Sequence, residues 1–259
     1  MEAERTLGII GVGEIAHAIV SGLCDGTDVP PAIALSPRGA RTAAELAERH
    51  ENVRVCPDNQ AVADAADVLI LAVRPQQRAE ALAPLTVRPG TLVISAVAGT
   101  SVADVGELLG HDGPVVRVIP LPAVSRRSSI TVTYPAHPVA EALFDRLGGA
   151  LVAPAEEAFD VFSALTSTFT SYYAYLATLA DWGTRQGIDG EAADRYVRGL
   201  FENAAHALTD ASKTLPRIAA GHETPGGINE RIRTTWYEPH REPLERALDA
   251  LLVDLKRGY

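Results

Sequence analysis

The sequence predicts an α/β protein whose N-terminal part forms a doubly wound parallel sheet and whose C-terminal part is all-α. Three observations support this fold class. Short apolar runs alternate with segments of helical periodicity up to about residue 154, which is typical of a parallel sheet covered by helices. A glycine-rich turn joins the first apolar run to the first helix. From residue 155 only the helical period remains, so we expect two domains, 1–154 and 155–259.

The glycine-rich turn lies in LGIIGVGEIAHAI, residues 7–19, where the pattern G-x-G-x-x-A separates a strand from a helix. Gly11 permits a tight turn, Gly13 leaves room for a pyrophosphate, and Ala16 allows the helix to pack closely on the strand. Free N–H groups and the positive dipole end of the helix favour phosphates. This is the context of a Rossmann-like dinucleotide site, the alternative being a glycine turn without a ligand. The residues expected at the cofactor are Gly11, Gly13, Glu14, Ile15 and Ala16.

The residues at the end of the second expected strand, 32–36, indicate whether the site binds the ribose of NAD or the 2′-phosphorylated ribose of NADP. An acidic residue there accepts hydrogen bonds from both ribose hydroxyls and favours NAD. Here Ser36 ends the strand, and Arg38 and Arg41 follow. Hydroxyl and guanidinium groups suit a 2′-phosphate, because the guanidinium donates to phosphate oxygens. We therefore expect NADP, unless the two arginines are simply solvated.

The alternation continues through the rest of the first domain. Further strands are expected over 53–56, 68–73, 91–96, 115–119, 129–133 and 150–153, and helices over 41–49, 59–66, from about 76, 101–109 and 139–147. Pro75 stops the strand 68–73, whose end should lie beside the dinucleotide, because ligands sit at the carboxyl ends of parallel strands. The small residues Ala98 and Gly99 would let a flat nicotinamide ring lie against the backbone.

The second domain has no strand pattern. We expect one long helix over 156–184, further helices over 190–213, 215–220, 228–236 and 244–256, and a turn over 224–227. Helices this apolar, without a sheet, usually bury themselves against a second subunit. We therefore expect an obligate homodimer built by the C-terminal helices, the alternative being a compact monomeric domain.

Composition excludes several classes of function. The net charge of −10 argues against nucleic-acid binding, which needs a basic surface. The two cysteines fit neither a disulfide framework nor a metal motif, so no metal is expected. No signal pattern and no run of about 18 apolar residues occurs, so we expect a cytoplasmic protein with no membrane contact.

Five motifs, taken together, resemble pyrroline-5-carboxylate reductases. They are GVGEIA (11–16), DVLILAVRPQ (67–76), VISAVAG (93–99), VVRVIP (115–120) and TPGG (224–227). The resemblance spans nearly the whole chain. It implies an enzyme that reduces a cyclic imine with NAD(P)H. It also implies a Rossmann domain followed by a helical domain that interlocks with a second subunit. The active site would lie in the cleft between the nucleotide domain and the helices of the dimer.

The cofactor half matches this family position by position. The resemblance places the ribose phosphate at Ser36 and Arg38, an Ala-Val-Lys-Pro segment at Ala72, Val73, Arg74 and Pro75 with arginine in place of lysine, and the nicotinamide at Ala98 and Gly99.

The substrate half departs from the family pattern. Met-Pro-Asn-Thr-Pro becomes 119–123 without the asparagine, and Ser-Gly-Ser-Gly-Pro-Ala-Tyr becomes 166–172 with only the final tyrosine kept. Pro-Gly-Gly-Thr-Thr becomes 225–229, so that the Asn229 amide replaces the hydroxyl that serves the imine nitrogen in the family. Because these changes fall together in one expected cleft, we expect an altered small-molecule substrate.

Imine reduction needs a hydride from the nicotinamide, a well-placed C=N carbon and a donor for the nitrogen. Ser167, Asn229 and Tyr173 are the catalytic candidates, with Thr168, Tyr172 and Asp181 behind them; a tyrosine on this helix is more often a packing residue. We expect an NADPH-dependent reductase of a cyclic imine or related C=N or C=O compound. Two alternatives stay open: a reductase-derived protein that binds NADP in a non-redox role, and a true pyrroline-5-carboxylate reductase with a reworked carboxylate grip, for which Arg126 and Arg127 are candidates.

Overall fold

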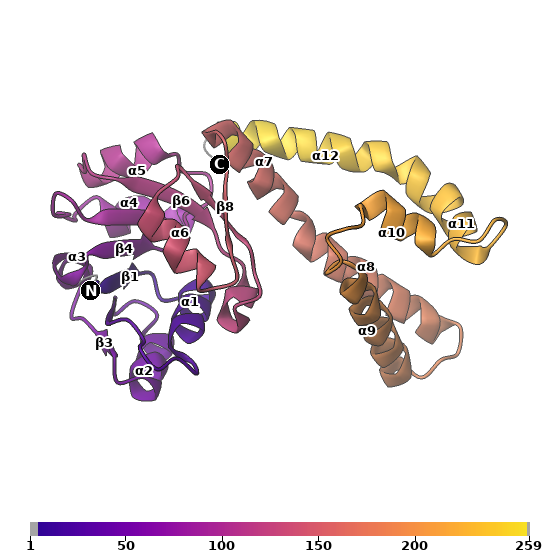
Figure 1. Cartoon of the computed structure of the whole chain (residues 1–259), viewed down its shortest axis with the longest axis horizontal. Helices are drawn as coiled ribbons and strands as arrows, with labels where there is room; N and C mark the ends of the chain where they lie inside the picture. Colours follow the sequence, from indigo (N-terminus) through magenta and orange to yellow (C-terminus); the bar gives the residue numbers. More distant parts are fainter. Residues whose placement is uncertain (1–4, 258–259) are drawn as a thin grey trace. The chain divides into compact units, whose positions relative to one another are not determined.

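The structure is a computed structural model that describes residues 5–257 (Figure 1). The chain divides into two compact units. The first contains the residues up to Ser163 together with the last helical turn from Val253, and the second is Ala164–Leu252. The first unit therefore takes in the beginning of a helix that the sequence assigned to the C-terminal domain.

The first unit is built on an eight-stranded sheet with the order β3-β2-β1-β4-β5-β6-β7-β8. The strands are β1 Leu7–Ile10, β2 Ile33–Leu35, β3 Val53–Val55, β4 Val68–Leu71, β5 Leu92–Ser95, β6 Val115–Ile119, β7 Thr131–Tyr134 and β8 Ala150–Val152. The first six are parallel, and the strand order reverses between β1 and β4. This reversal is the switch point at which doubly wound sheets bind ligands.

The last two strands differ from the expected parallel sheet. β7 pairs antiparallel with β6, and β8 pairs parallel with β7, so both run against the first six. The connection from β6 to β7 holds only a short 3₁₀ helix, η2 Pro122–Arg126. It has no crossover helix to carry the chain back across the sheet, and a parallel pairing needs one. The predicted doubly wound sheet is otherwise confirmed.

Helices cover both faces of this sheet (Figure 1). They are α1 Glu14–Cys24, α2 Ala40–Arg49, α3 Asn59–Ala65, η1 Pro75–Gln77, α4 Arg78–Leu82, α5 Val102–Leu109 and α6 Pro138–Asp145. The next helix, α7 Glu156–Thr166, packs against β7 through Phe159, and its last three residues belong to the second unit. Alternate strand residues enter two separate cores: Ile9 packs with α1, α2 and α6, and Ile10 packs with α3, α4 and α5. Because both faces are buried, the central strands β1, β4 and β5 read as nearly continuous apolar runs, whereas the edge strand β3 contains the exposed Arg54.

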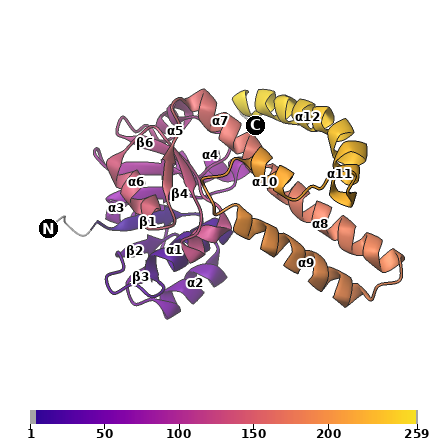
Figure 2. The ribbon, with the colours of Figure 1, turned by 45° about the vertical axis from the view of Figure 1, so that its right-hand side comes forward.

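The second unit contains the remaining helices, α8 Thr168–Arg185, α9 Gly190–Ala207, α10 Leu215–Gly221, α11 Ile228–Ile232 and most of α12 Glu238–Lys256, with a π-helical segment, η3 Arg233–Tyr237, between the last two. α8 and α9 lie side by side as an antiparallel pair (Figure 2). No helix among residues 5–257 is long and apolar enough to cross a bilayer.

Three helix predictions in this unit are wrong. The long helix expected over 156–184 is broken at Ser167, where the hydroxyls of Ser167 and Thr168 donate to the carbonyls of Ala164 and Leu165 and compete with the helical ladder. The helix expected to reach 213 ends at Ala207, because a 3₁₀ turn follows it. The two helices expected from 228 onward form one helical run, in which Pro243 is tolerated.

Candidate functional site

The glycine turn lies at the switch point of the sheet, between the end of β1 and the start of α1. Gly11 has φ +91°, a conformation that L side chains rarely adopt. A Cβ on Gly11 would lie 2.7 Å from the backbone carbon and oxygen of Ala72, so the turn is pressed against the end of β4. The structure thus brings the first glycine motif and the segment after β4 together.

Gly13 is not crowded as Gly11 is, because a Cβ on Gly13 would meet no heavy atom within 4 Å. Its backbone is extended, with φ −99° and ψ −160°, and it is the N-cap of α1 without a capping side chain. Glu14 is exposed, and Ala16 is fully buried against the sheet. The first turn of α1 therefore has open space in front of it, which suits a pyrophosphate on the helix N-terminus.

Ser36 has a structural role that its position in the sequence did not predict. Its side chain is fully buried, and its hydroxyl accepts a hydrogen bond of 3.0 Å from the backbone N–H of Gly11. Ser36 therefore holds the glycine turn in place. The contact of Ser36 with a 2′-phosphate stays a prediction.

Arg38, by contrast, is an exposed residue. The loop that carries it lies against the glycine turn: Val12 N–H donates to the Arg38 carbonyl at 3.4 Å, and a Cβ on Gly39 would lie 2.2 Å from the Val12 oxygen. The Arg38 guanidinium is half exposed and lies 3.5 Å from the carboxylate of Glu80, which is itself mostly exposed. An exposed pair of this kind is weak, so the guanidinium remains available to an anion.

The other expected cofactor residues follow the neighbouring strands at the same edge of the sheet. Ala72 to Pro75 follow β4, and Ala98 and Gly99 follow β5. Arg74 and Ala98 are exposed, Val73 is buried, and Gly99 has φ +64°. All thirteen expected positions thus lie at the carboxyl ends of β1, β2, β4 and β5, although their contact with a cofactor stays a prediction.

The three catalytic candidates all lie in the second unit. The hydroxyl of Ser167 donates to the Ala164 carbonyl at 2.7 Å, and the side-chain amide of Asn229 donates to the His222 carbonyl at 2.7 Å. Tyr173 is exposed, with its ring edge-on to that of Phe169 at 5.5 Å. Two of these donors are therefore engaged within their own helix or loop, and the identity of the proton donor stays a prediction.

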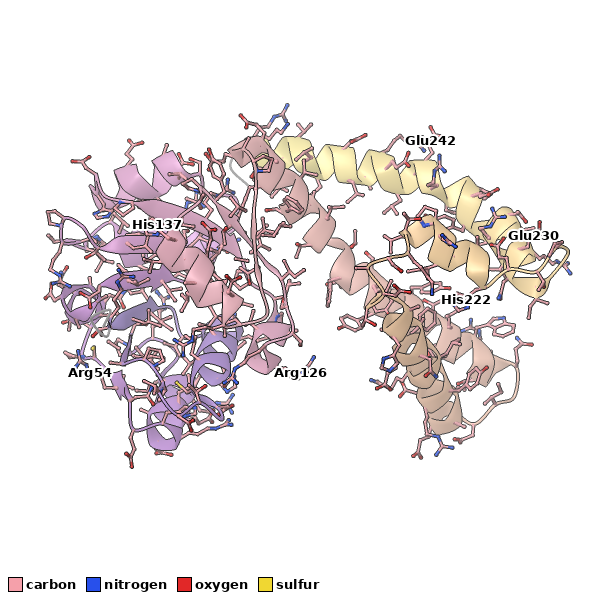
Figure 3. All side chains as sticks on the ribbon, viewed as in Figure 1. Arg54, Arg126, His137, His222, Glu230 and Glu242 are labelled. Carbon is pink, nitrogen blue, oxygen red and sulfur yellow. The ribbon has the colours of Figure 1, made fainter. Side chains whose placement is uncertain are left out.

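Of the two arginines weighed as a carboxylate grip, Arg127 is engaged elsewhere. Its guanidinium donates to the carbonyls of Gly22 and Asp25 at the end of α1, and so caps that helix. Arg126 is exposed and labelled in Figure 3, where its side chain points away from the sheet.

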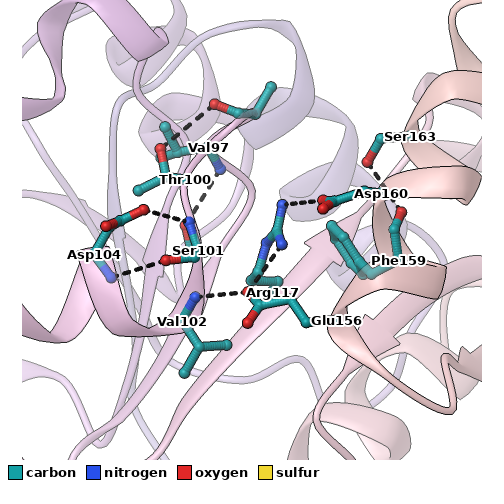
Figure 4. A network of polar contacts seen from close by, with 12 residues as sticks. Val97, Thr100, Ser101, Val102, Asp104, Arg117, Glu156, Phe159, Asp160 and Ser163 are labelled. Atoms are coloured by element: carbon teal, nitrogen blue, oxygen red, sulfur yellow. Dashed lines mark hydrogen bonds and ion pairs between the residues drawn. The ribbon is translucent and has the colours of Figure 1, made fainter. Parts of the chain in front are cut away.

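Sequence reasoning missed a buried charged cluster beside the β5–α5 turn (Figure 4). Arg117 lies within β6, and its side chain is only 5% exposed. Its Nη1 donates to Glu156 Oε1 at 2.9 Å and its Nη2 to Asp160 Oδ1 at 3.1 Å, and its guanidinium carbon lies 4.3 Å from the centre of the Phe159 ring. We call Arg117, Glu156 and Asp160 the Arg117 cluster. The one signal in the sequence was an arginine inside the apolar strand VVRVI.

The Arg117 cluster adjoins the capped start of α5. Ser101 is the N-cap, and it forms a capping box with Asp104. Hydrogen bonds from Ser101 hold the pKa of the Asp104 carboxyl below its usual value, with smaller contributions from Arg78 and Arg117. A cavity of about 340 Å³ is lined here by Gly99, Ser101, Asp104 and Lys256 together with the Arg117 cluster. The cavity thus includes one residue of the expected nicotinamide turn.

Comparisons with known proteins identify the family of the chain. Residues 6–99 match the family described as NADP oxidoreductase, coenzyme F420-dependent. A pyrroline-5-carboxylate reductase of Corynebacterium melassecola is 31% identical over 86% of each chain, and one of Pseudomonas aeruginosa is 29% identical over 94% of this chain and 93% of its own. The crystal structure of the enzyme from Streptococcus pyogenes is 25% identical, covers 98% of each chain and superposes with a TM-score of 0.82. The chain belongs to the pyrroline-5-carboxylate reductase family.

Proposed function

We propose that this protein reduces the C=N bond of a cyclic imine or a related small compound with NADPH. The observation that carries the proposal is the glycine turn at the switch point, where Gly13 opens onto space that a Cβ would fill. When bound, the nicotinamide supplies the hydride. The chain's own residues seat the pyrophosphate at the start of α1, take the 2′-phosphate at Arg38, and offer Ala98 and Gly99 as a flat surface for the ring.

The substrate is proposed to differ from pyrroline-5-carboxylate. This rests on the residues that replace the family's substrate motifs, among them Ser167 and Asn229. The hydroxyl hydrogen of Ser167 is engaged in a local bond, whereas the Asn229 amide uses only one of its two hydrogens. A protonated iminium already carries its proton, so a weak donor such as Asn229 or Tyr173 can suffice to hold the nitrogen.

The proposal is tested by following NADPH oxidation with a panel of cyclic imines, with and without a carboxylate, that includes pyrroline-5-carboxylate. Turnover of a member other than pyrroline-5-carboxylate is expected. Turnover of pyrroline-5-carboxylate alone would overturn the altered substrate. Tight NADPH binding without turnover of any imine or ketone would instead favour the non-redox alternative.

We infer a homodimer from the apolar surface of the second unit. Large apolar side chains that are more than two-fifths exposed occur on α8, α9 and the later helices: Phe169, Tyr172, Tyr173, Trp182, Tyr196, Leu200, Leu208, Leu215, Ile228, Ile232, Trp236 and Tyr237. Such an extent of exposed apolar surface marks an interaction site. Light scattering on the purified protein should give twice the chain mass or a multiple of it, and a monomer would contradict the inference.

Cofactor selection gives a sharper test. Arg38→Ala is expected to raise the Kd for NADPH by about 10- to 100-fold and to change the Kd for NADH by less than about threefold, because a guanidinium–phosphate pair is charge-assisted. Titration of both cofactors, followed by their fluorescence, measures the two constants. Arg54→Ala removes the same charge from another exposed arginine of this unit and serves as the control. Equal losses of affinity for NADH and NADPH would show that Arg38 does not bind the 2′-phosphate.

A further inference from the structure

The Arg117 cluster is costly to bury, and its charges do not cancel. Arg117 is 4% exposed as a residue, and the Asp160 side chain is 13% exposed. One guanidinium faces two carboxylates, and the Nε of Arg117 has no hydrogen-bond partner. A well-packed apolar side chain at such a position is often as stable as a buried ion pair, so stability alone does not explain an arginine here.

The cluster joins three segments that are distant in the sequence. Glu156 Oε1 accepts from Arg117 Nη1 and also from the backbone N–H of Val102, at 2.8 Å. A single carboxylate oxygen at the start of α7 is therefore bonded both to the middle of β6 and to the first residue of α5 (Figure 4). Val102 comes three residues after Gly99, so this bond fixes the downstream end of the expected nicotinamide turn.

The same guanidinium also fixes the direction of α7. Glu156 and Asp160 are four residues apart and lie on one face of the helix, each held by a different nitrogen of Arg117, with Phe159 beneath the guanidinium plane. Two points of attachment one turn apart set the angle of a helix as well as its position. The part of α7 that carries these contacts belongs to the first unit, which includes the chain up to Ser163.

We propose that Arg117, Glu156 and Asp160 are positioning residues, which hold the β5–α5 turn in the one arrangement that places the nicotinamide for hydride transfer. They do so without contact with the reactants. Only the catalytic part of the proposal, the placement of the nicotinamide, rests on the proposed function. Its structural part, that Glu156 holds the turn over 97–102, stands on the cofactor-free protein.

The first readout is therefore hydrogen exchange in the cofactor-free protein. Glu156→Ala is expected to speed exchange of the Val102 amide at least about tenfold and to leave β4 amides unchanged, because only the local bond is lost. Glu156→Gln keeps an oxygen that can accept from Val102 and should restore most of the protection. Glu157→Gln removes a charge from the neighbouring residue of the same cavity, which is not bonded to Arg117, and is the matched control. Unchanged exchange in Glu156→Ala would overturn the proposal.

The second readout separates positioning from simple stability. Arg117→Met should leave the Kd for NADPH within about threefold, but lower kcat for an imine that turns over by about tenfold or more, since small misplacements of reacting groups are costly. Arg117→Lys keeps the positive charge but lacks the planar guanidinium. Its kcat should lie between those of the unmodified protein and Arg117→Met. Unchanged kcat, or a loss of kcat matched by an equal loss of folded protein, would overturn the catalytic part. If no imine is turned over by the unmodified protein, the proposed function fails, and the exchange experiment still decides the positioning role.

Discussion

Gly13→Val is expected to raise the Kd for NADPH by at least about 100-fold while lowering the free energy of unfolding by no more than about 1 kcal/mol, the cost of valine in place of glycine at the N-cap of α1. The backbone of Gly13 is extended, a conformation that valine adopts readily, and no heavy atom lies within 4 Å of the Cβ position. The Cβ would therefore meet no other part of the protein and would lie at the start of α1. A pyrophosphate that loses its approach to the helix N-terminus forfeits about 3 kcal/mol or more, which corresponds to the expected change.

Titration of NADPH against the purified variant measures the binding loss, and a thermal melt without cofactor measures the stability. Gly13→Ala is the graded control, because a single methyl group fills less of the same space and should cost less affinity. Unchanged NADPH affinity in Gly13→Val would mean that the dinucleotide does not use this turn. A loss of stability well beyond about 1 kcal/mol would mean that the space is not open in the folded protein.

The parts of the fold that were predictable depend on local pattern. The strands β1 to β6 could be found because each is a short apolar run next to a helix, and the glycine turn because G-x-G-x-x-A fixes its place. The direction of β7 depends on whether the chain recrosses the sheet, and no residue of β7 records this. The break at Ser167 depends on two hydroxyls that bond to the preceding turn, which an apolar period does not reveal.

The candidate site also has features that could be predicted from the sequence and features that could not. The residues after β1, β2, β4 and β5 gather at one edge because the topology of parallel strands requires it. The hydrogen bond that Ser36 accepts from Gly11 could not be predicted from the sequence, since a buried hydroxyl and an exposed one look alike there. Arg117 was missed because Glu156 and Asp160 are 39 and 43 residues away, so nothing near it in the sequence marks it as paired.

Gly11→Ala is expected to lower the free energy of unfolding by about 3 kcal/mol or more, and so to remove much of the stability of an ordinary domain. Two costs add. An alanine at φ +91° is strained by about 1–2 kcal/mol, and its Cβ would meet the Ala72 backbone at 2.7 Å. Ala72 cannot retreat easily, because its N–H donates to the Ile10 carbonyl at 2.8 Å and continues the pairing of β1 with β4.

Gly90→Ala separates the two costs. Gly90 has φ +90°, almost the same as Gly11, but a Cβ there would meet nothing within 4 Å. Its substitution should therefore show the backbone strain alone, and Gly11→Ala should exceed it by more than about 1 kcal/mol. Chemical denaturation of both variants gives the comparison, provided that the slopes with denaturant agree. Equal losses for the two would show that the turn can move away from β4, and the close fit between the glycine turn and the strand end would then not be what fixes the dinucleotide site.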